Sequence, residues 1–206
     1  NEEKTIKTAS NLRNYYHSKG WFNNEVTYNV EKDSNKLAKV TYKVKKNKPY
    51  ILDSLTPYIS TAVIDSLYKL KFSKTSLLKK GEQYDEQNFE NEQERINTFL
   101  RNSGFYHFAQ DYIHFEIDTI ETNRKVHTDL KISNRVIRGD DSTTTIPFKV
   151  YKIREVNIFT DDNYENRYKP ISDTTIHRNF NIYSKNKLRY RPKALTDAVF
   201  INKGDV

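Results

Sequence analysis

The residues best suited to chemistry in this chain are its five histidines, which are accompanied by many Asp and Glu side chains. Imidazole and carboxylate groups bind metal ions, or act as general acids and bases, when they lie close together. The histidines do not cluster at ligand spacing, and the sequence has no His-Glu-x-x-His, no Gly-x-Ser-x-Gly and no phosphate-binding glycine loop. We therefore predict that the chain is not an enzyme and that it uses no metal ion or cofactor.

Two of the histidines lie in neighbouring segments, 111–118 and 125–132, which alternate polar and apolar residues. If these segments form a β-hairpin with Ile113 opposite Leu130, the outer face pairs groups of opposite charge. The expected outer pairs are His114 with Asp129, Glu116 with His127, and Asp118 with Lys125. Cross-strand pairing explains these histidines better than catalysis or metal binding does.

The composition excludes thiol chemistry, because a chain without Cys has no disulfide, thiolate metal site or thiol nucleophile. No window approaches the ~18 consecutive apolar residues of a membrane-spanning helix. The sequence also lacks Met, and a helical pattern starts within its first residues. We therefore expect a fragment of a longer protein.

The net charge of +8 is compatible with binding to nucleic acid, but the 35 basic and 27 acidic residues are interspersed. No run of five or more Lys and Arg residues occurs. The aromatic residues fall mostly at positions that face inward in the expected strands, where packing accounts for them. We expect no nucleic acid as a partner, although a basic α+β module that binds nucleic acid stays an alternative.

The elements that position these segments recur along the chain. A helical pattern of apolar residues ends at a glycine twice, 84 positions apart, and two aromatic residues follow each glycine. A glycine just past a helix adopts the left-handed conformation that satisfies the last carbonyl groups. We predict structural corners, with their aromatic residues in the core, at Gly20, Trp21, Phe22 and at Gly104, Phe105, Tyr106.

A first β-hairpin is predicted directly after the Gly20 corner, because segments 25–30 and 38–44 alternate strictly. One register satisfies both faces of this hairpin. It pairs Val26 with Val44, Tyr28 with Tyr42 and Val30 with Val40 on a buried face, and Glu25 with Lys45 and Glu31 with Lys39 outside.

Between the two hairpins, the sequence predicts a strand at 49–55, a short helix capped by Ser60 or Thr61, and a long helix capped by Asp85. The complete middle unit therefore has the order strand, helix, helix, strand, strand. Its second strand follows the Gly104 corner.

The rest of the chain is expected to begin a third unit. Residues 133–145 are typical of a linker or an extended hairpin end, 148–159 of a strand, and 161–192 lack clear periodicity. The predicted domains are 1–46, the C-terminal part of a first unit; 47–146, a complete second unit; and 147–206, the N-terminal part of a third.

This arrangement resembles the POTRA domains of BamA/TamA-type outer-membrane proteins. The resemblance rests on Gly81-Glu82-Gln83-Tyr84-Asp85, the Arg95-Ile96 helix, the stretch from Leu100 to Tyr106 and the strand that ends in Asp118. It implies an α+β fold of tandem POTRA-like β-α-α-β-β units, each a three-stranded mixed sheet packed against two helices. The Tyr- and Asn-rich composition resembles the version found in Bacteroidota.

The resemblance also implies a location and partners. POTRA domains lie in the periplasm, tethered to a C-terminal membrane β-barrel that lies outside this chain, and take part in outer-membrane protein assembly or translocation. The implied partners are unfolded outer-membrane protein clients, periplasmic accessory proteins, or both. The parent could be BamA-like, TamA-like or a two-partner secretion transporter.

In this family, the second strand of a unit lies at a sheet edge, where an extended partner segment can be added by β-augmentation. The resemblance maps this edge to Asp111, Tyr112, Ile113, His114, Phe115, Glu116, Ile117 and Asp118. A second candidate edge comprises Glu25, Val26, Thr27, Tyr28, Asn29 and Val30. Two alternatives remain open: edges that are merely protected by charge, and a purely structural spacer or dock for accessory proteins.

Overall fold

The computed structural model describes residues 2–34, 37–120 and 122–206. Its contacts divide the chain into two units, one comprising Asn1–Leu100 with His107–Phe148 and the other Arg101–Tyr106 with Lys149–Val206. The three domains 1–46, 47–146 and 147–206 stay predictions. Among the described residues, no helix combines the length and the hydrophobicity needed to cross a membrane.

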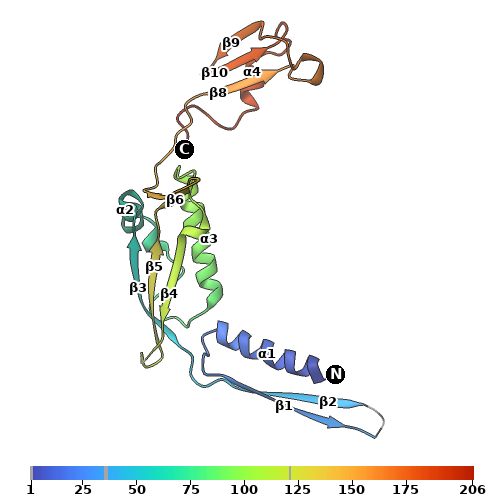
Figure 1. The fold of residues 1–206 in the computed structure, drawn as a ribbon, viewed down its shortest axis with the longest axis vertical. Coiled ribbons are helices and arrows are strands. Elements are labelled where there is room, and N and C mark those ends of the chain that lie inside the picture. The colour runs from blue at the N-terminus through green and yellow to red at the C-terminus, as the bar shows by residue number, and fades with distance from the viewer. Residues whose placement is uncertain (1, 35–36, 121) are drawn as a thin grey trace. The chain divides into compact units, whose positions relative to one another are not determined.

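The first unit begins with helix α1 (Glu2–Ser18) and the antiparallel hairpin of β1 (Glu25–Lys32) and β2 (Ala38–Lys45). The predicted register is confirmed, because Val26 lies opposite Val44 and Glu25 lies opposite Lys45. The prediction of a buried face is wrong for most of the hairpin, since Tyr28 and Val30 are each 39% exposed. Figure 1 shows the reason: α1 lies beside only part of the hairpin, which extends beyond it.

The centre of the first unit is a three-stranded mixed sheet. Its strands run in the order β3-β5-β4, with β5 parallel to β3 and antiparallel to β4. This confirms the predicted α+β unit of β-α-α-β-β order. The elements are β3 (Ile51–Ile59), α2 (Ala62–Leu70), η1 (Phe72–Thr75), α3 (Glu86–Asn102), η2 (Gln110–Tyr112), β4 (Ile113–Asp118) and β5 (Lys125–Ile132).

Both helices and the sheet bury apolar side chains. Ile64 of α2, Ile96 and Leu100 of α3, and Ile113 and Leu130 of the sheet are completely buried. Amphipathic spacing on the helices and alternation in the strands produce this burial. The hydrophobic core is therefore shared by all the elements of the middle unit.

The predicted register of the second hairpin is wrong by two residues. Ile113 lies opposite Ile132, and Phe115 lies opposite Leu130. A shift of two residues keeps each side chain on the same face, so the choice depends on packing rather than on polarity. Glu116 consequently faces Asp129, not His127.

The two predicted helix caps behave differently. The carboxylate Oδ1 of Asp85 accepts a hydrogen bond from the Gln87 amide at 3.0 Å, which confirms it as the cap of α3. Thr61 stands at the N-cap of α2, but its hydroxyl donates to Asn134 and accepts from the Phe148 amide. Thr61 therefore ties the start of α2 to the chain that follows β5.

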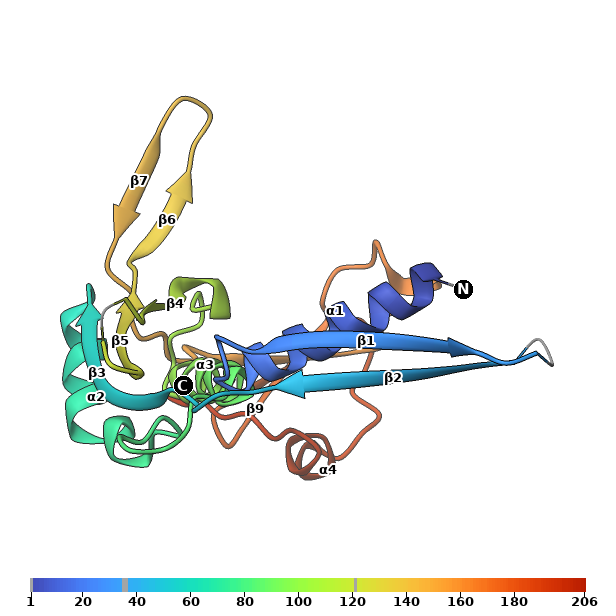
Figure 2. The ribbon, with the colours of Figure 1, turned by 90° about the horizontal axis from the view of Figure 1, so that it is seen from below.

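Residues 133–145 contain most of a hairpin ribbon rather than an unstructured linker. Strands β6 (Arg135–Arg138) and β7 (Thr143–Ile146) pair only with each other among the described residues. Figure 2 shows the ribbon reaching away from the β3-β5-β4 sheet. Of the two predicted readings of this segment, the extended hairpin end is the correct one.

The second of the two compact units, Arg101–Tyr106 with Lys149–Val206, contains another three-stranded mixed sheet, with the order β8-β10-β9. Its elements are β8 (Val156–Thr160), η3 (Tyr164–Asn166), β9 (Asp173–His177), β10 (Phe180–Ser184) and α4 (Pro192–Asp197). The predicted strand 148–159 is wrong in its first part, since the strand begins only at Val156. The β9–β10 hairpin was not expected in the weakly periodic segment 161–192.

Candidate functional site

The predicted edge strand is β4, which lies at one side of the central sheet. Two backbone contacts show which way its peptide groups point. The Tyr112 carbonyl accepts from the Ser133 amide on the β5 side, at 3.0 Å, whereas the Ile113 carbonyl accepts from Gln93 Nε2 at 2.7 Å. Because peptide groups alternate along a strand, the N–H and C=O groups of Ile113, Phe115 and Ile117 point away from β5.

The free part of this edge is short. The Ile113 amide donates to the Gln110 carbonyl and its carbonyl accepts from Gln93, so both of its groups are satisfied. No described residue supplies a partner for the outward groups of Phe115 and Ile117. The edge therefore offers two N–H and two C=O groups to another chain.

The structure places the predicted edge residues in different roles. Asp111 and Tyr112 belong to η2, not to the strand, because the chain turns there before it joins the sheet. His114, Glu116 and Asp118 direct their peptide groups toward β5 and their side chains to the exposed face. Only Phe115 and Ile117 present free backbone.

The side chains at this edge are partly apolar and partly charged. The Phe115 ring packs on Phe89, with ring centroids 5.2 Å apart, while Ile117 is 39% exposed. Glu116 pairs with Lys131, and this hydrogen bond raises the pKa of the Lys131 ammonium above its ordinary value. The β4 edge thus presents apolar side chains next to an ion pair whose two charges cancel.

The opposite edge of the sheet, strand β3, is closed at its start by the chain itself. The Leu52 amide donates to the Glu82 carbonyl at 2.8 Å, and the Gly81 amide donates to the Leu52 carbonyl at 2.7 Å. Farther along, the Ser60 amide points to β5, so the nitrogen of Pro57 points outward and has no hydrogen to donate. By the same alternation Leu55 and Ile59 also point outward, and no described residue supplies a partner for their N–H and C=O groups, so this edge is closed at its start and interrupted at Pro57.

The second candidate edge, β1, pairs with β2 on one side and with no other strand in the described parts of the chain. Glu25, Val26, Thr27, Tyr28, Asn29 and Val30 all lie on it. Of these side chains only Val26 is buried, so the strand lacks the supporting core that β4 has. Binding at β1 stays a prediction.

The two predicted corners have the expected backbone. Gly20 and Gly104 have φ angles of +86° and +87°, which favour glycine. Phe105 is completely buried, and Phe22 packs on Tyr84 with ring centroids 4.9 Å apart. The Lys46 ammonium lies 4.9 Å from the centroid of the Trp21 ring, whereas Tyr106 is 69% exposed and therefore lies outside the predicted core.

One grouping resembles a catalytic triad in composition but not in geometry. Ser54 Oγ lies 3.0 Å from His127 Nδ1, and Asp53 Oδ2 lies 3.8 Å from the same nitrogen. A relay needs the acid and the nucleophile on opposite ring nitrogens. The described residues also contain no group of three or more His, Asp and Glu side chains able to hold a metal ion.

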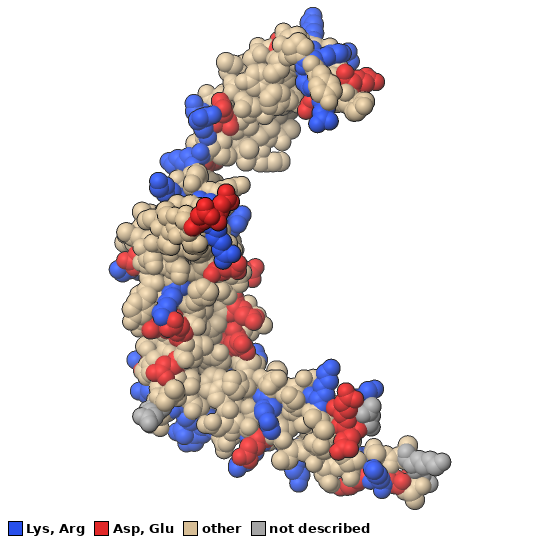
Figure 3. All heavy atoms as spheres, in the orientation of Figure 1, with Lys and Arg blue, Asp and Glu red and all other residues tan. Residues whose placement is uncertain are grey.

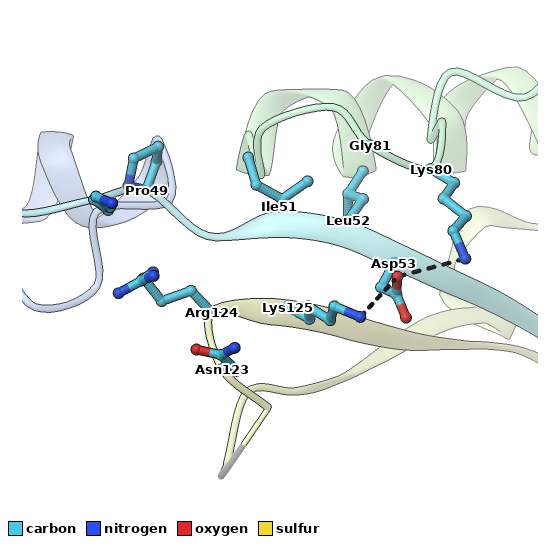
Figure 4. A pocket seen from close by; sticks show the side chains of 10 residues that line it. Pro49, Ile51, Leu52, Asp53, Lys80, Gly81, Asn123, Arg124 and Lys125 are labelled. Atoms are coloured by element: carbon cyan, nitrogen blue, oxygen red, sulfur yellow. Dashed lines mark ion pairs between the residues drawn. The ribbon is translucent and has the colours of Figure 1, made fainter.

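A basic pocket of about 440 Å³, which no sequence pattern predicted, lies at the start of β3 and β5. Lys48, Lys80, Arg124 and Lys125 line it together with Asp53, and Figure 4 shows Lys80 and Lys125 both directed at the Asp53 carboxylate. Partial desolvation raises the pKa of Asp53, but Lys125 and Lys80 outweigh it and the pKa is lowered. The basic residues come from separate segments of the chain, so no single sequence motif could predict the pocket.

Comparison with known families gives one match. Residues 1–47 match the POTRA family, described as surface antigen variable number repeat. A comparison with curated proteins gives no significant match. The predicted POTRA resemblance is confirmed at residues 1–47, whereas the suggested Bacteroidota type stays a prediction.

Two of the solved structures similar to this chain come from Haemophilus species. The crystal structure of BamA POTRA3-5 from Haemophilus influenzae has 12% identity and a TM-score of 0.43, over 97% of this chain and 62% of that one. BamA from Haemophilus ducreyi lacking POTRA domains 1-3 has 12% identity and a TM-score of 0.37, over 66% and 24%. This chain spans less than two thirds of either structure.

Proposed function

We propose that this chain belongs to a periplasmic scaffold that binds polypeptides during outer-membrane protein assembly or translocation. The POTRA match at residues 1–47 supports the class of protein. The proposed partners are unfolded outer-membrane protein clients, periplasmic accessory proteins, or both.

The observation that carries the proposal is the pair of unpaired backbone positions on β4. An extended segment laid beside Phe115 and Ile117 makes up to four main-chain hydrogen bonds, which demand little of the partner's sequence. Each contributes about 0.5–1.5 kcal/mol net, so the contact alone is weak. Weak, sequence-tolerant contact suits a scaffold that must release its clients.

Proline scanning on the parent protein tests the edge. Ile117→Pro removes an outward N–H from β4, whereas Ile117→Thr keeps that N–H and removes similar apolar surface. With a photo-cross-linker at the exposed His114, we expect cross-links to polypeptide in wild type and Ile117→Thr, and their loss in Ile117→Pro. Unchanged cross-linking in an Ile117→Pro protein with normal urea unfolding would refute binding at this edge.

A structural spacer is the second candidate, because the first corner is firmly tied to the middle unit. Lys19 Nζ lies 2.8 Å from the Asp85 carboxylate, and Gln83 Nε2 donates to the Lys19 carbonyl at 2.6 Å. A spacer requires this attachment but not the β4 edge. Loss of function in Lys19→Ala, together with normal function in Ile117→Pro, would favour the spacer.

A further inference from the structure

The basic pocket lies beside a bulge in strand β3. Strand β3 has a bulge between Leu52 and Ser54, which leaves Asp53 without a partner in the β5 ladder. The bulge lies where the Gly81 loop and the turn before β5 meet β3, and the residues that line the pocket come from these segments. Figure 4 shows that these three segments surround it.

The pocket has more positive than negative charge. Lys80 Nζ lies 3.4 Å and Lys125 Nζ lies 3.7 Å from Asp53 Oδ1, so two ammonium groups share one carboxylate. Among the described residues, no acidic side chain pairs with Lys48 or Arg124, which also line the pocket. An anionic group in the pocket would meet an excess of cations.

Arg124 occupies a strained backbone position at the rim. The Lys125 amide donates to the Thr122 carbonyl at 3.1 Å, and Asn123 and Arg124 have φ angles of +50° and +60°. These values define a type I′ turn, whose second central position favours glycine. A left-handed side-chain-bearing residue costs roughly 1–2 kcal/mol, so the guanidinium is held here against a local preference.

The walls of the pocket restrict the kind of anion. Pro49, Ile51 and Leu52 provide an apolar surface beside the cations, which suits an aliphatic or aromatic side chain. Asp53 disfavours a doubly charged phosphate more strongly than a singly charged carboxylate. The first part of β3 is already covered by Glu82, so recognition here depends on side chains and not on added backbone pairing.

We propose that this pocket binds the carboxylate of an Asp or Glu residue that lies next to an apolar residue in an extended polypeptide partner. The inference rests on the proposed function in that the ligand is a polypeptide. It uses a surface separate from the β4 edge, and it adds a preference for acidic segments to an otherwise sequence-tolerant contact.

Peptide binding to the chain of residues 1–206 tests the inference. The probe is the acetylated, amidated, fluorescein-labelled peptide Gly-Ser-Glu-Phe-Ser-Gly, compared with peptides that carry Gln or phosphoserine in place of Glu. Arg124→Gly removes the guanidinium and relaxes the turn, Lys48→Gln removes the second unpaired cation, and Lys74→Gln is an exposed control outside the pocket.

We expect the Glu peptide to bind about tenfold more tightly than the Gln peptide, and Arg124→Gly and Lys48→Gln each to weaken binding about threefold to tenfold. Lys74→Gln and Ile117→Pro are expected to bind like wild type, and added salt to weaken binding. Loss of binding in Ile117→Pro alone would assign the peptide to the β4 edge and overturn the pocket.

Three further results would also overturn the proposal. They are equal binding of the Glu and Gln peptides, tighter binding of the phosphoserine peptide, and binding only to phosphatidylglycerol vesicles. Normal cross-linking at β4 with any of these results would leave the proposed function intact and reject only the pocket.

Discussion

The backbone amide of Tyr50 donates to the carbonyl of Gly20 across 2.8 Å, and the same bond recurs between Tyr151 and Gly104, also at 2.8 Å. In each case the carbonyl of a corner glycine accepts a hydrogen bond from the segment that precedes the next sheet. The loop glycines repeat as well, since the Gly81 amide donates to Leu52 and the Gly204 amide to Ile153. The repeat in the sequence is therefore a repeat of a hydrogen-bonded junction.

Alanine at the corner glycines tests this junction. A Cβ on Gly20 would lie 2.8 Å from the Tyr84 carbonyl oxygen, whereas a Cβ on Gly81 meets nothing within 4 Å, and both φ angles are positive. Gly81→Ala carries backbone strain only and should cost about 1 kcal/mol. Gly20→Ala adds the clash and should cost about 2–4 kcal/mol in urea unfolding.

The same comparison applies to the second unit, where a Cβ on Gly104 would lie 2.8 Å from Val150 Cγ1 and one on Gly204 would be free. In urea unfolding, we expect Gly104→Ala to lose more unfolding free energy than Gly204→Ala. Equal losses would show that close packing at the corner does not contribute to stability.

Glu92 is a completely buried carboxylate on α3, and it holds the η1 region in place. Arg95 donates to both of its oxygens at 2.8 Å and to the Phe72 carbonyl at 2.9 Å, while the Leu77 amide donates to Glu92 at 3.0 Å. Glu92→Ala leaves the Arg95 guanidinium without its carboxylate partner and should lower the free energy of unfolding by about 3–5 kcal/mol.

The exposed neighbour Glu94 supplies the control for this prediction, and Glu94→Ala should cost less than about 0.5 kcal/mol. Replacing both partners with Met should recover much of the loss, because no buried charge remains unpaired. Equal stability of Glu92→Ala and Glu94→Ala in urea unfolding would contradict the assigned role.

Tyr84 makes the stability of the first unit sensitive to alkaline pH. Burial, with smaller contributions from Glu86 and Asp85, raises the pKa of its phenol from 10.0 to about 12. The folded state therefore binds the proton more tightly, so this contribution is complete below pH 10.0 and is lost as the pH rises toward 12. The loss should be on the order of 2 kcal/mol.

Urea unfolding of wild type and Tyr84→Phe at several pH values measures this effect. The Phe variant cannot ionise, so its stability should fall less steeply between pH 10.0 and about 12, while other groups titrate equally in both proteins. Parallel curves would show that Tyr84 ionises as readily as in the unfolded chain.

Two valines distinguish the exposed first hairpin from the central core. Val30 on β1 is 39% exposed, and Val126 on β5 is completely buried. Val126→Ala should cost about 2–3 kcal/mol, whereas Val30→Ala should cost less than about 1 kcal/mol. Similar losses in urea unfolding would indicate that the first hairpin packs against something in solution.

Local sequence patterns predicted the features that depend on residues close together in the chain. The positive φ angles at Gly20 and Gly104 followed from the expected helix ends, and the β1–β2 register followed from strict alternation. The β4–β5 register did not, because outer charges such as Glu116 and His127 suggested pairs that buried packing of Ile113 on Ile132 overrides. Figure 3 shows basic and acidic side chains interspersed on the surface, so charge alone does not select one register.

Contacts between distant segments could not be read from the sequence. The pocket joins Lys48, Lys80 and Arg124, which only the folded β3 bulge brings together. The β9–β10 hairpin turns at Arg178 and Asn179, both with positive φ, and neither is the glycine that marks such turns. At Arg124 beside the pocket and at Arg178 and Asn179, residues other than glycine have positive φ, so the usual sequence signal of a turn is absent.

Pro57 determines how a further chain can add to the β3 edge of the central sheet. Gly81 and Glu82 cover the first part of that edge, and beyond them Leu55 and Ile59 direct outward groups that no described residue pairs, on either side of Pro57, which has no N–H. A strand added at β3 therefore lacks one hydrogen bond between these two positions, whereas one added at β4 meets Phe115 and Ile117 without such an interruption. The proline is a gatekeeper that disfavours edge-to-edge growth of the sheet on the β3 side.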